Sequence, residues 1–212
     1  MEASSSRSNR RRAVVIGAGF GGLAAAIRLR ALHGYDVEVI ERHDHAGGRA
    51  RVFSDQGFVF DAGPTVITAP FLFEELWTIC GKRMSDYVKL VPVAPFYRIR
   101  FNDGEVFDYS GDAKAMTDQI RRLSPRDVDG YERLLKMSEA IFSVGFDKLA
   151  HVPFGSWTSM LKIAPAMVRL KSYRTVYGLV SQYIEDERLR QVLSFHPLLV
   201  GGNPFTTTSI YT

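Results

Sequence analysis

The sequence predicts an α/β fold organised around a Rossmann-like unit near its amino end. An apolar, strand-favouring run at 13–16 leads into the turn Gly17-Ala-Gly-Phe-Gly-Gly22. An alanine- and leucine-rich run follows at 23–32, and a second apolar run at 36–40 ends before Glu41. A strand, a glycine turn, a helix and a second strand within about 30 residues form a βαβ unit. The glycine turn is therefore predicted to bind a dinucleotide.

Each glycine of this turn has its own physical role. Gly17 permits a sharp turn, Gly19 lets a pyrophosphate approach the backbone, and Gly22 lets the helix pack closely on the first strand. Glu41 stands 19 residues after Gly22, where a carboxylate accepts hydrogen bonds from a ribose 2′-hydroxyl. Because a carboxylate repels a 2′-phosphate, the pattern favours FAD or NAD over NADP. A glycine-rich turn without a ligand is the alternative.

Composition indicates a globular protein whose body is nearly neutral. Of the 212 residues, 46% are hydrophobic and 24% are charged, which is ordinary for a globular domain. The net charge of +4 comes mostly from residues 1–12, where four arginines face one glutamate. We predict a disordered basic tail there, without the apolar core of a secretory signal. No apolar run of about 18 residues occurs, so no spanning helix is expected. The single cysteine, Cys80, excludes an internal disulfide and is expected in the core.

A short loop with two glycines and a cation follows Glu41. Gly47 and Gly48 permit close approach, and the Arg49 guanidinium can meet a pyrophosphate; a solvated basic loop is the alternative. The run from Gly17 to Arg49 resembles FAD-dependent oxidoreductases of the amine-oxidase and carotenoid-desaturase type. The resemblance implies that FAD is the cofactor. It implies these contacts to FAD: Gly17, Gly19, Gly22, Glu41, Gly48 and Arg49.

The segment at 55–65 sharpens the resemblance. It reads Asp-Gln-Gly-Phe-Val-Phe-Asp-Ala-Gly-Pro-Thr and is similar to a block of the bacterial and fungal phytoene desaturases. In that family the block lies against the cofactor, so Gly63, Pro64 and Thr65 are implied to lie near the flavin. A plain turn is the alternative, because a Gly-Pro pair ends a strand. Residues 13–65 are thus predicted to be the first part of an FAD-binding domain.

Residues 66–111 are predicted to form a helix and a hairpin. The helix begins at Pro70 and ends before Gly81, and the hairpin strands at 97–101 and 105–109 flank a turn that contains Gly104. We interpret this segment as part of an inserted mixed α+β substrate domain. Its aromatic residues either line an apolar pocket or pack the sheet: Phe96, Tyr97, Phe101, Phe107 and Tyr109.

Two capped helices are predicted after the hairpin. Asp112 precedes the first, and Ser124 is the expected N-cap of the second, with Pro125 at its first position and Asp127 in its first turn. We assign both helices to the scaffold, without chemistry.

Residues 149–184 contain no Asp or Glu. Cationic residues alternate there with aromatic and long apolar ones on helices that we expect Pro165 to break. This composition is typical of a surface that lies in a membrane interface; an ordinary buried helical pair is the alternative. The basic residues are too few and scattered for a nucleic-acid surface. The predicted membrane contacts are Trp157, Lys162, Arg169, Lys171 and Arg174.

The last segment begins Phe195-His-Pro-Leu-Leu-Val-Gly-Gly-Asn-Pro-Phe and closely resembles the phytoene desaturases, a resemblance that covers residues 13–212. It implies FAD-dependent desaturation of phytoene toward lycopene or neurosporene, by hydride transfer from an allylic-flanked C–H to the flavin. Oxygen or a quinone is the implied electron acceptor, and the implied location is peripheral, on the cytoplasmic face of a membrane. The alternatives are a carotenoid 3,4-desaturase or isomerase, and a non-catalytic, membrane-associated FAD-binding subunit.

No residue is predicted to be the catalytic base. His196 stands before Pro197 on an apolar stretch, where a structural role is more common, and no metal-ligand spacing or nucleophile motif occurs. The flavin is the only implied source of redox chemistry. No βαβ repeat follows Ile40, so we expect the sequence beyond Thr212 to complete the FAD domain. The predicted fold is then an incomplete Rossmann-like FAD-binding domain, an inserted substrate domain, and a helical membrane-facing region at 112–212.

Overall fold

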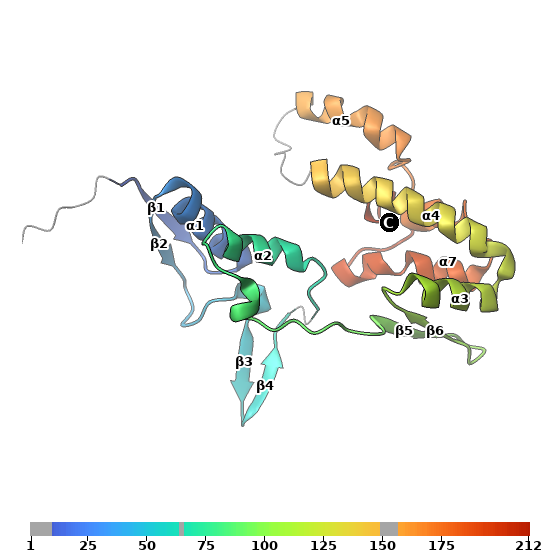
Figure 1. Cartoon of the computed structure of the whole chain (residues 1–212), viewed down its shortest axis with the longest axis horizontal. Coiled ribbons are helices and arrows are strands. Elements are labelled where there is room, and N and C mark those ends of the chain that lie inside the picture. Colours follow the sequence, from blue (N-terminus) through green and yellow to red (C-terminus); the bar gives the residue numbers. More distant parts are fainter. Residues whose placement is uncertain (1–9, 64–65, 149–156) are drawn as a thin grey trace, which may run out of the picture. The chain divides into compact units, whose positions relative to one another are not determined.

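The computed structural model describes residues 10–63, 66–148 and 157–212, without the side chains of 146–148, 157–160 and 162. The chain forms two compact units, of which the first ends at Val91 and the second begins at Pro92 (Figure 1). The predicted segment 66–111 is therefore divided: its helix belongs to the first unit and its hairpin to the second. Its role as a substrate domain stays a prediction.

The first unit begins with the predicted βαβ arrangement, which is confirmed. Strand β1 (Arg12–Ile16) and strand β2 (Asp36–Ile40) are parallel, with helix α1 (Phe20–His33) between them. Gly34 ends α1 in the left-handed conformation expected of a helix C-terminus. The sequence placed Arg12 in the disordered tail, but it opens β1 and pairs with Asp36, because β2 offers its backbone a partner.

A hairpin and a helix complete this unit. Strands β3 (Val52–Asp55) and β4 (Phe58–Asp61) are antiparallel, and both turn residues, Gln56 and Gly57, have positive φ, as a type I′ turn requires. Helix α2 (Pro70–Thr78) begins at Pro70, as predicted. It packs beside α1, where Phe73 meets Phe20 edge to face at 5.3 Å between ring centroids. Cys80 was expected in the core but is exposed, because it follows the last turn of α2.

The second unit is mostly helical and has one hairpin (Figure 1). Its elements are β5 (Tyr97–Arg100), β6 (Val106–Tyr109), α3 (Ala113–Leu123), α4 (Val128–Phe142), α5 (Trp157–Arg169), α6 (Val176–Val180) and α7 (Glu187–Ser194), with 3₁₀ turns at Pro125–Asp127, His196–Val200 and Ser209–Tyr211. The hairpin, α3, α4, α6 and α7 share one hydrophobic core. Its fully buried side chains include Phe107, Ile120, Val176, Val180, Leu189 and Val192.

The aromatic residues of the hairpin pack within the unit. Phe107 is completely buried in the core, and Phe101 and Tyr109 pack against that core. Tyr97 stacks on Tyr109 at 4.8 Å and lies 4.9 Å from the ring of Phe195. Sheet packing therefore explains these side chains, and Phe96 alone of the five is exposed.

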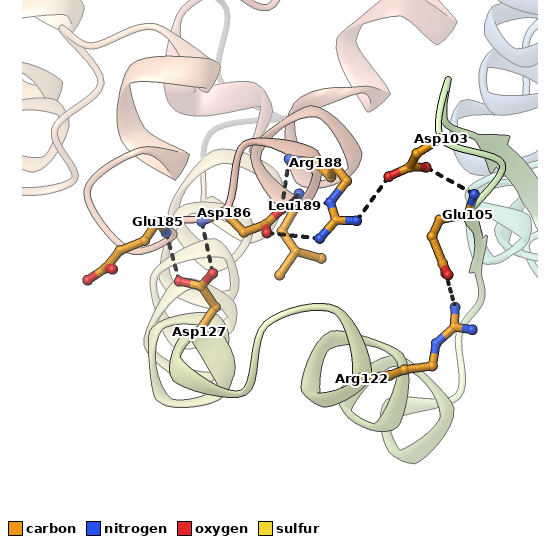
Figure 2. Close-up of polar contacts among 8 residues, drawn as sticks. All are labelled: Asp103, Glu105, Arg122, Asp127, Glu185, Asp186, Arg188 and Leu189. Atoms are coloured by element: carbon orange, nitrogen blue, oxygen red, sulfur yellow. Dashed lines mark hydrogen bonds and ion pairs between the residues drawn. The ribbon is translucent and has the colours of Figure 1, made fainter.

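The two helix starts differ from each other. The Asp112 carboxylate accepts the N–H groups of Lys114 and Ala115 at 2.9 and 3.0 Å, so this predicted N-cap is confirmed. Ser124 makes no capping hydrogen bond, because a 3₁₀ turn at Pro125–Asp127 precedes α4. The carboxylate of Asp127 turns away from its own helix toward the chain before α7 (Figure 2).

Helix α5 corrects the expectation of a break at Pro165. The helix runs without interruption from Trp157 to Arg169, with Pro165 inside it. Proline removes the hydrogen bond to the carbonyl four residues earlier, here that of Leu161. Both residues are exposed, so solvent reaches this side of the helix. None of the helices in the described ranges has the length and apolar character needed to cross a bilayer.

Candidate dinucleotide site

The loops that follow β1 and β2 line a cavity in the first unit that is open to solvent. Its volume is about 1050 Å³. Its walls come from the start of α1, from the loop and turn after β2, and from the end of β4. The lining residues are Gly19, Phe20, Gly21, His43, Gly47, Gly48, Arg49, Ala50, Arg51, Ala62 and Gly63.

The glycine turn is held by the two loops around it through the backbone of Ala18. The Ala18 N–H donates to Glu41 Oε2 at 2.7 Å, and the Ala18 carbonyl accepts the N–H of Gly47 at 2.9 Å. Just before it, the Gly17 N–H donates to the carbonyl of Ile40 at 2.7 Å. These bonds fix the turn over the ends of both strands. The start of α1 then lies at the cavity, where the first N–H groups of a helix have no intrahelical acceptor.

Close backbone approaches explain two of the predicted glycines. A Cβ on Gly22 would stand 2.0 Å from the carbonyl oxygen of Gly17 and 3.4 Å from the side chain of Val15. This contact is the close packing of helix on strand that the sequence predicted for Gly22. A Cβ on Gly63 would stand 2.1 Å from the carbonyl oxygen of Arg49. Gly63 thereby brings the end of β4 against the loop that carries Arg49.

Gly19 and Gly48 face each other at the cavity without side chains. A Cβ on Gly48 would lie 3.1 Å from the Cα of Gly19, whereas one on Gly19 would meet only the Cα of Gly48, at 3.9 Å. Gly19 has φ −76° and ψ 175°, an extended conformation that any residue adopts. Its surroundings within the chain thus leave room for a side chain. The bare backbone suits the close approach of a ligand such as a pyrophosphate.

Glu41 binds the loops as well as facing the solvent. Its second carboxylate oxygen, Oε1, accepts the N–H of His43 at 3.0 Å. The hydrogen bond from Ala18, and after it the one from His43, lower the pKa of Glu41 from its ordinary value of 4.5. The group is therefore an anion at neutral pH. Each carboxylate oxygen has a second lone pair, so Glu41 can hold the loops and accept a ribose hydroxyl together.

The predicted cofactor residues that the structure describes thus lie around one site. Gly19, Gly48, Arg49 and Gly63 line the cavity, while Gly17, Gly22 and Glu41 shape its walls. Arg49 is exposed and forms no ion pair with any described residue, so its charge is available to an anion. Pro64 and Thr65 lie outside the described residues. Reasoning from the sequence did not find the hydrogen bonds of Ala18 and His43 to Glu41, or Ala62 as a lining residue. It did indicate Gly47, because the Gly47-Gly48 pair permits close approach.

The predicted membrane residues lie in the second unit and are spread along α5 and the turn after it. The side chains of Trp157 and Lys162 lie outside the described residues. Arg169, the last residue of α5, is exposed. Lys171 donates to Gln182 Oε1 at 2.9 Å and lies 5.7 Å from the ring centroid of Tyr183. Arg174 lies 5.8 Å from the ring centroid of Tyr173.

His196 opens the 3₁₀ turn of the second unit that ends at Val200. Its Nε2 is buried without a hydrogen-bond partner among the described residues, and burial lowers the pKa of the imidazole. Within the described ranges, no group of three or more His, Cys, Asp and Glu side chains is placed to hold a metal ion.

Known proteins resemble the chain over nearly its whole length. A family model described as an NAD(P)-binding Rossmann-like domain matches residues 15–82. The lycopene-forming phytoene desaturase of Pseudescherichia vulneris is 54% identical over 202 residues, 95% of this chain and 41% of that protein. The neurosporene-forming phytoene desaturase of Rhodobacter capsulatus is 43% identical over 200 residues, 94% of this chain and 38% of that protein. The chain therefore spans about 40% of the length of these curated relatives.

Solved structures agree on the fold. A wild-type putrescine oxidase with bound putrescine matches with a TM-score of 0.55 at 21% identity, over 95% of this chain and 40% of that one. At this identity the likeness concerns the fold alone. Together with the Rossmann-like family model and the parallel β1–β2 pair, it confirms the predicted α/β fold with a dinucleotide-binding unit.

Proposed function

We propose that the chain belongs to the phytoene desaturase family and that it is the cofactor-binding part of an FAD-dependent enzyme that desaturates phytoene. The identity to curated phytoene desaturases along almost the entire chain is the observation that carries the proposal. The cavity between the glycine turn and the Gly47–Gly48 loop supports it, because its bare backbone and carboxylate suit a dinucleotide.

Each residue of the site has a task toward FAD. The backbone at Gly19 and the start of α1 accept the pyrophosphate, since helix N-termini favour anions. Glu41 accepts hydrogen bonds from the ribose of the adenosine half. Arg49 supplies a cation next to the Gly48 backbone, which suits the pyrophosphate or the flavin side. Gly63 lines the cavity, and the resemblance implies that it stands on the flavin side. Pro64 and Thr65 are proposed as flavin contacts from the resemblance alone.

When bound, FAD supplies a two-electron acceptor for a hydride from an allylic-flanked C–H of the polyene, with oxygen or a quinone as the final oxidant. The chain's own residues bind and orient; none of them is assigned as a base. The greater identity to the lycopene-forming relative than to the neurosporene-forming one favours lycopene as the product.

A peripheral membrane location is part of the proposal, because phytoene is an apolar polyene that dissolves in bilayers. Helix α5 supports it with an apolar stripe on its solvent side: Leu161 is 73% and Val168 is 66% exposed. Ala164 and Pro165 stand between them at helical spacing and are also exposed. An exposed apolar helix face next to Arg169, the last residue of the same helix, is typical of helices that lie in a lipid interface.

The test is reconstitution of the purified intact protein with FAD and phytoene in liposomes. We expect a flavin spectrum and a polyene absorbance that grows with time and identifies lycopene by its number of conjugated double bonds. Assays without oxygen, with and without a quinone, identify the acceptor. Bound flavin without any change in phytoene would overturn the desaturase proposal and favour a non-catalytic FAD-binding subunit. Conversion of another carotenoid instead would favour a 3,4-desaturase or isomerase.

A further inference from the structure

A second cavity lies in the helical unit, between α4 and the end of α5. Its volume is about 420 Å³. One wall comes from α4, where Arg133, Lys136, Met137 and Ala140 line it. These four positions follow the spacing of one helix face. Two of them are cations and two are apolar, although the sequence alone assigned this helix to the scaffold.

The opposite wall adds a third cation. Arg169 ends α5, and Leu170 and Tyr183 complete the lining. A further cation lies at the Tyr183 ring, because the Lys171 ammonium stands 5.7 Å from its centroid. Leu170 is buried and belongs to a small core with Ile141 and Leu179. The cavity thus has a basic, exposed rim and an apolar floor. The rim consists of Arg133, Lys136 and Arg169, and the floor of Met137, Ala140, Leu170 and Tyr183.

The three cations of the rim have no anionic partner in the part of the chain that the structure describes. Among the described residues, Arg133, Lys136 and Arg169 form no ion pair and no side-chain hydrogen bond, whereas arginines of α3 and α7 pair with carboxylates. The acidic residues of α4 at helical spacing from Arg133 and Lys136 are Asp129, Glu132 and Glu139, which are exposed and form no ion pair with them in the described structure. Cations gathered without counter-charges repel one another. An external anion placed among them removes that repulsion.

The apolar residues of the cavity floor determine which kind of anion fits. Met137, Ala140, Leu170 and Tyr183 present apolar surface, which a free, fully hydrated ion does not use. An anion that carries an apolar body satisfies both the rim and the floor. Arg169 stands four residues after Pro165 in α5, so it shares a helix face with the exposed apolar stripe from Leu161 to Val168, and that face offers contacts for acyl chains.

We propose that this cavity binds the phosphate diester of an anionic phospholipid, with phosphatidylglycerol as the representative headgroup. This inference rests on the peripheral membrane location in the proposed function, and it adds a defined headgroup site to it. Arg133 and Arg169 bind the phosphate oxygens, because guanidinium groups match that geometry with two donors each. Lys136 adds a point charge, and the methylenes of the acyl chains lie over the apolar floor.

The charge test compares two double variants of the intact protein. Arg133→Gln with Lys136→Gln is expected to weaken co-sedimentation with phosphatidylcholine vesicles that contain phosphatidylglycerol about thirtyfold at low salt. Arg100→Gln with Lys114→Gln is the matched control, because it removes one arginine and one lysine that are likewise exposed and without ion pairs in the described structure. An equal loss in both variants would overturn the site in favour of a diffuse charge effect, and so would no loss in the first.

A second variant leaves the charge unchanged. Ala140→Leu fills the floor of the cavity and is expected to weaken binding to the same vesicles severalfold, with an unchanged circular dichroism spectrum. Unchanged binding would overturn the headgroup site. Inorganic phosphate distinguishes the source of the anion: if phosphate alone binds as tightly as the vesicles by calorimetry, and Arg133→Gln abolishes that binding, the lipid assignment is wrong. Flavin content and phytoene conversion in detergent are unaffected by these variants, so failure here is separate from failure of the proposed function.

Discussion

The buried carboxylate of Asp127 accepts the backbone N–H of Glu185 at 2.7 Å across 58 positions of the sequence, and its second oxygen accepts the N–H of Asp186 at 2.9 Å (Figure 2). Asp186 in turn caps α7 by accepting the N–H groups of Arg188 and Leu189. The start of α4 and the start of α7 are thereby joined through two carboxylates in series.

Asp127→Ala is expected to lower the free energy of unfolding by about 3 kcal/mol, because two charge-assisted hydrogen bonds are lost and two N–H groups stay without an acceptor. Asp127 is 1% exposed, so water does not replace the carboxylate without rearrangement. Urea denaturation of the intact protein measures the effect. Asp129→Ala is the matched control on the exposed side of the same helix and should change the free energy by less than about 0.5 kcal/mol. Similar values for both variants would contradict the assigned role.

Gly19→Val is expected to abolish flavin retention and to keep the fold. A Cβ at this position meets only the Cα of Gly48 among the described residues, at 3.9 Å, but the side chain occupies the space that the pyrophosphate needs. Flavin absorbance and circular dichroism of the purified protein report the two effects separately. Ala25→Val is the control, because Ala25 is an exposed residue of α1 that does not line the cavity. A yellow, FAD-loaded Gly19→Val protein would refute the assignment of the site.

We predict that flavin retention depends on pH through Glu41. The direction of this dependence follows from the hydrogen bonds that the Glu41 carboxylate accepts. The N–H groups of Ala18 and His43 lower the pKa of Glu41 in the folded protein. A group of this kind stabilises the fold above its unfolded pKa, and the contribution is lost as the pH falls through the lowered folded pKa. Flavin release measured by fluorescence should therefore increase as the solution is acidified into that range. Glu41→Gln should release flavin more readily at neutral pH and lack this part of the acid dependence; an identical profile would contradict the prediction.

The free energy of membrane binding is expected to have two contributions, an electrostatic one that salt weakens and an apolar one that salt does not change. Changing Lys162, Arg169, Lys171 and Arg174 to Gln should weaken binding to anionic liposomes by a few kcal/mol at low salt, at about 1 kcal/mol per basic residue, and less at high salt.

The double variant Leu161→Gln with Val168→Gln replaces two exposed apolar side chains of α5. It should weaken binding equally at low and high salt, because the contribution that is lost is the burial of apolar surface. Co-sedimentation at two salt concentrations measures both variants, with flavin content as the check on folding. If neither variant changes the binding, α5 is an ordinary surface helix.

The βαβ unit was predictable because its signals are local. Strand, turn, helix and strand lie within about 30 residues, and Gly17 and Gly22 occupy the tight turn and the close helix–strand approach expected of them. The Asp112 cap and the hairpin around Gly104 were predictable for the same reason: each motif is complete within a few positions. The exposed Cys80 and the intact helix at Pro165 were not, since propensities cannot tell which side of a helix faces solvent.

The sequence by itself thus determined the dinucleotide-binding unit, the resemblance to the phytoene desaturases and the residue types at the site. Only the tertiary structure decided which distant residues meet. It placed the Gly48 backbone opposite Gly19, turned Asp127 from its own helix to Glu185 and Asp186, and brought Arg133 and Lys136 of α4 to the same cavity as Arg169. The physical reason is that such contacts depend on how whole elements pack, and packing depends on shape and burial summed over many residues rather than on any local pattern.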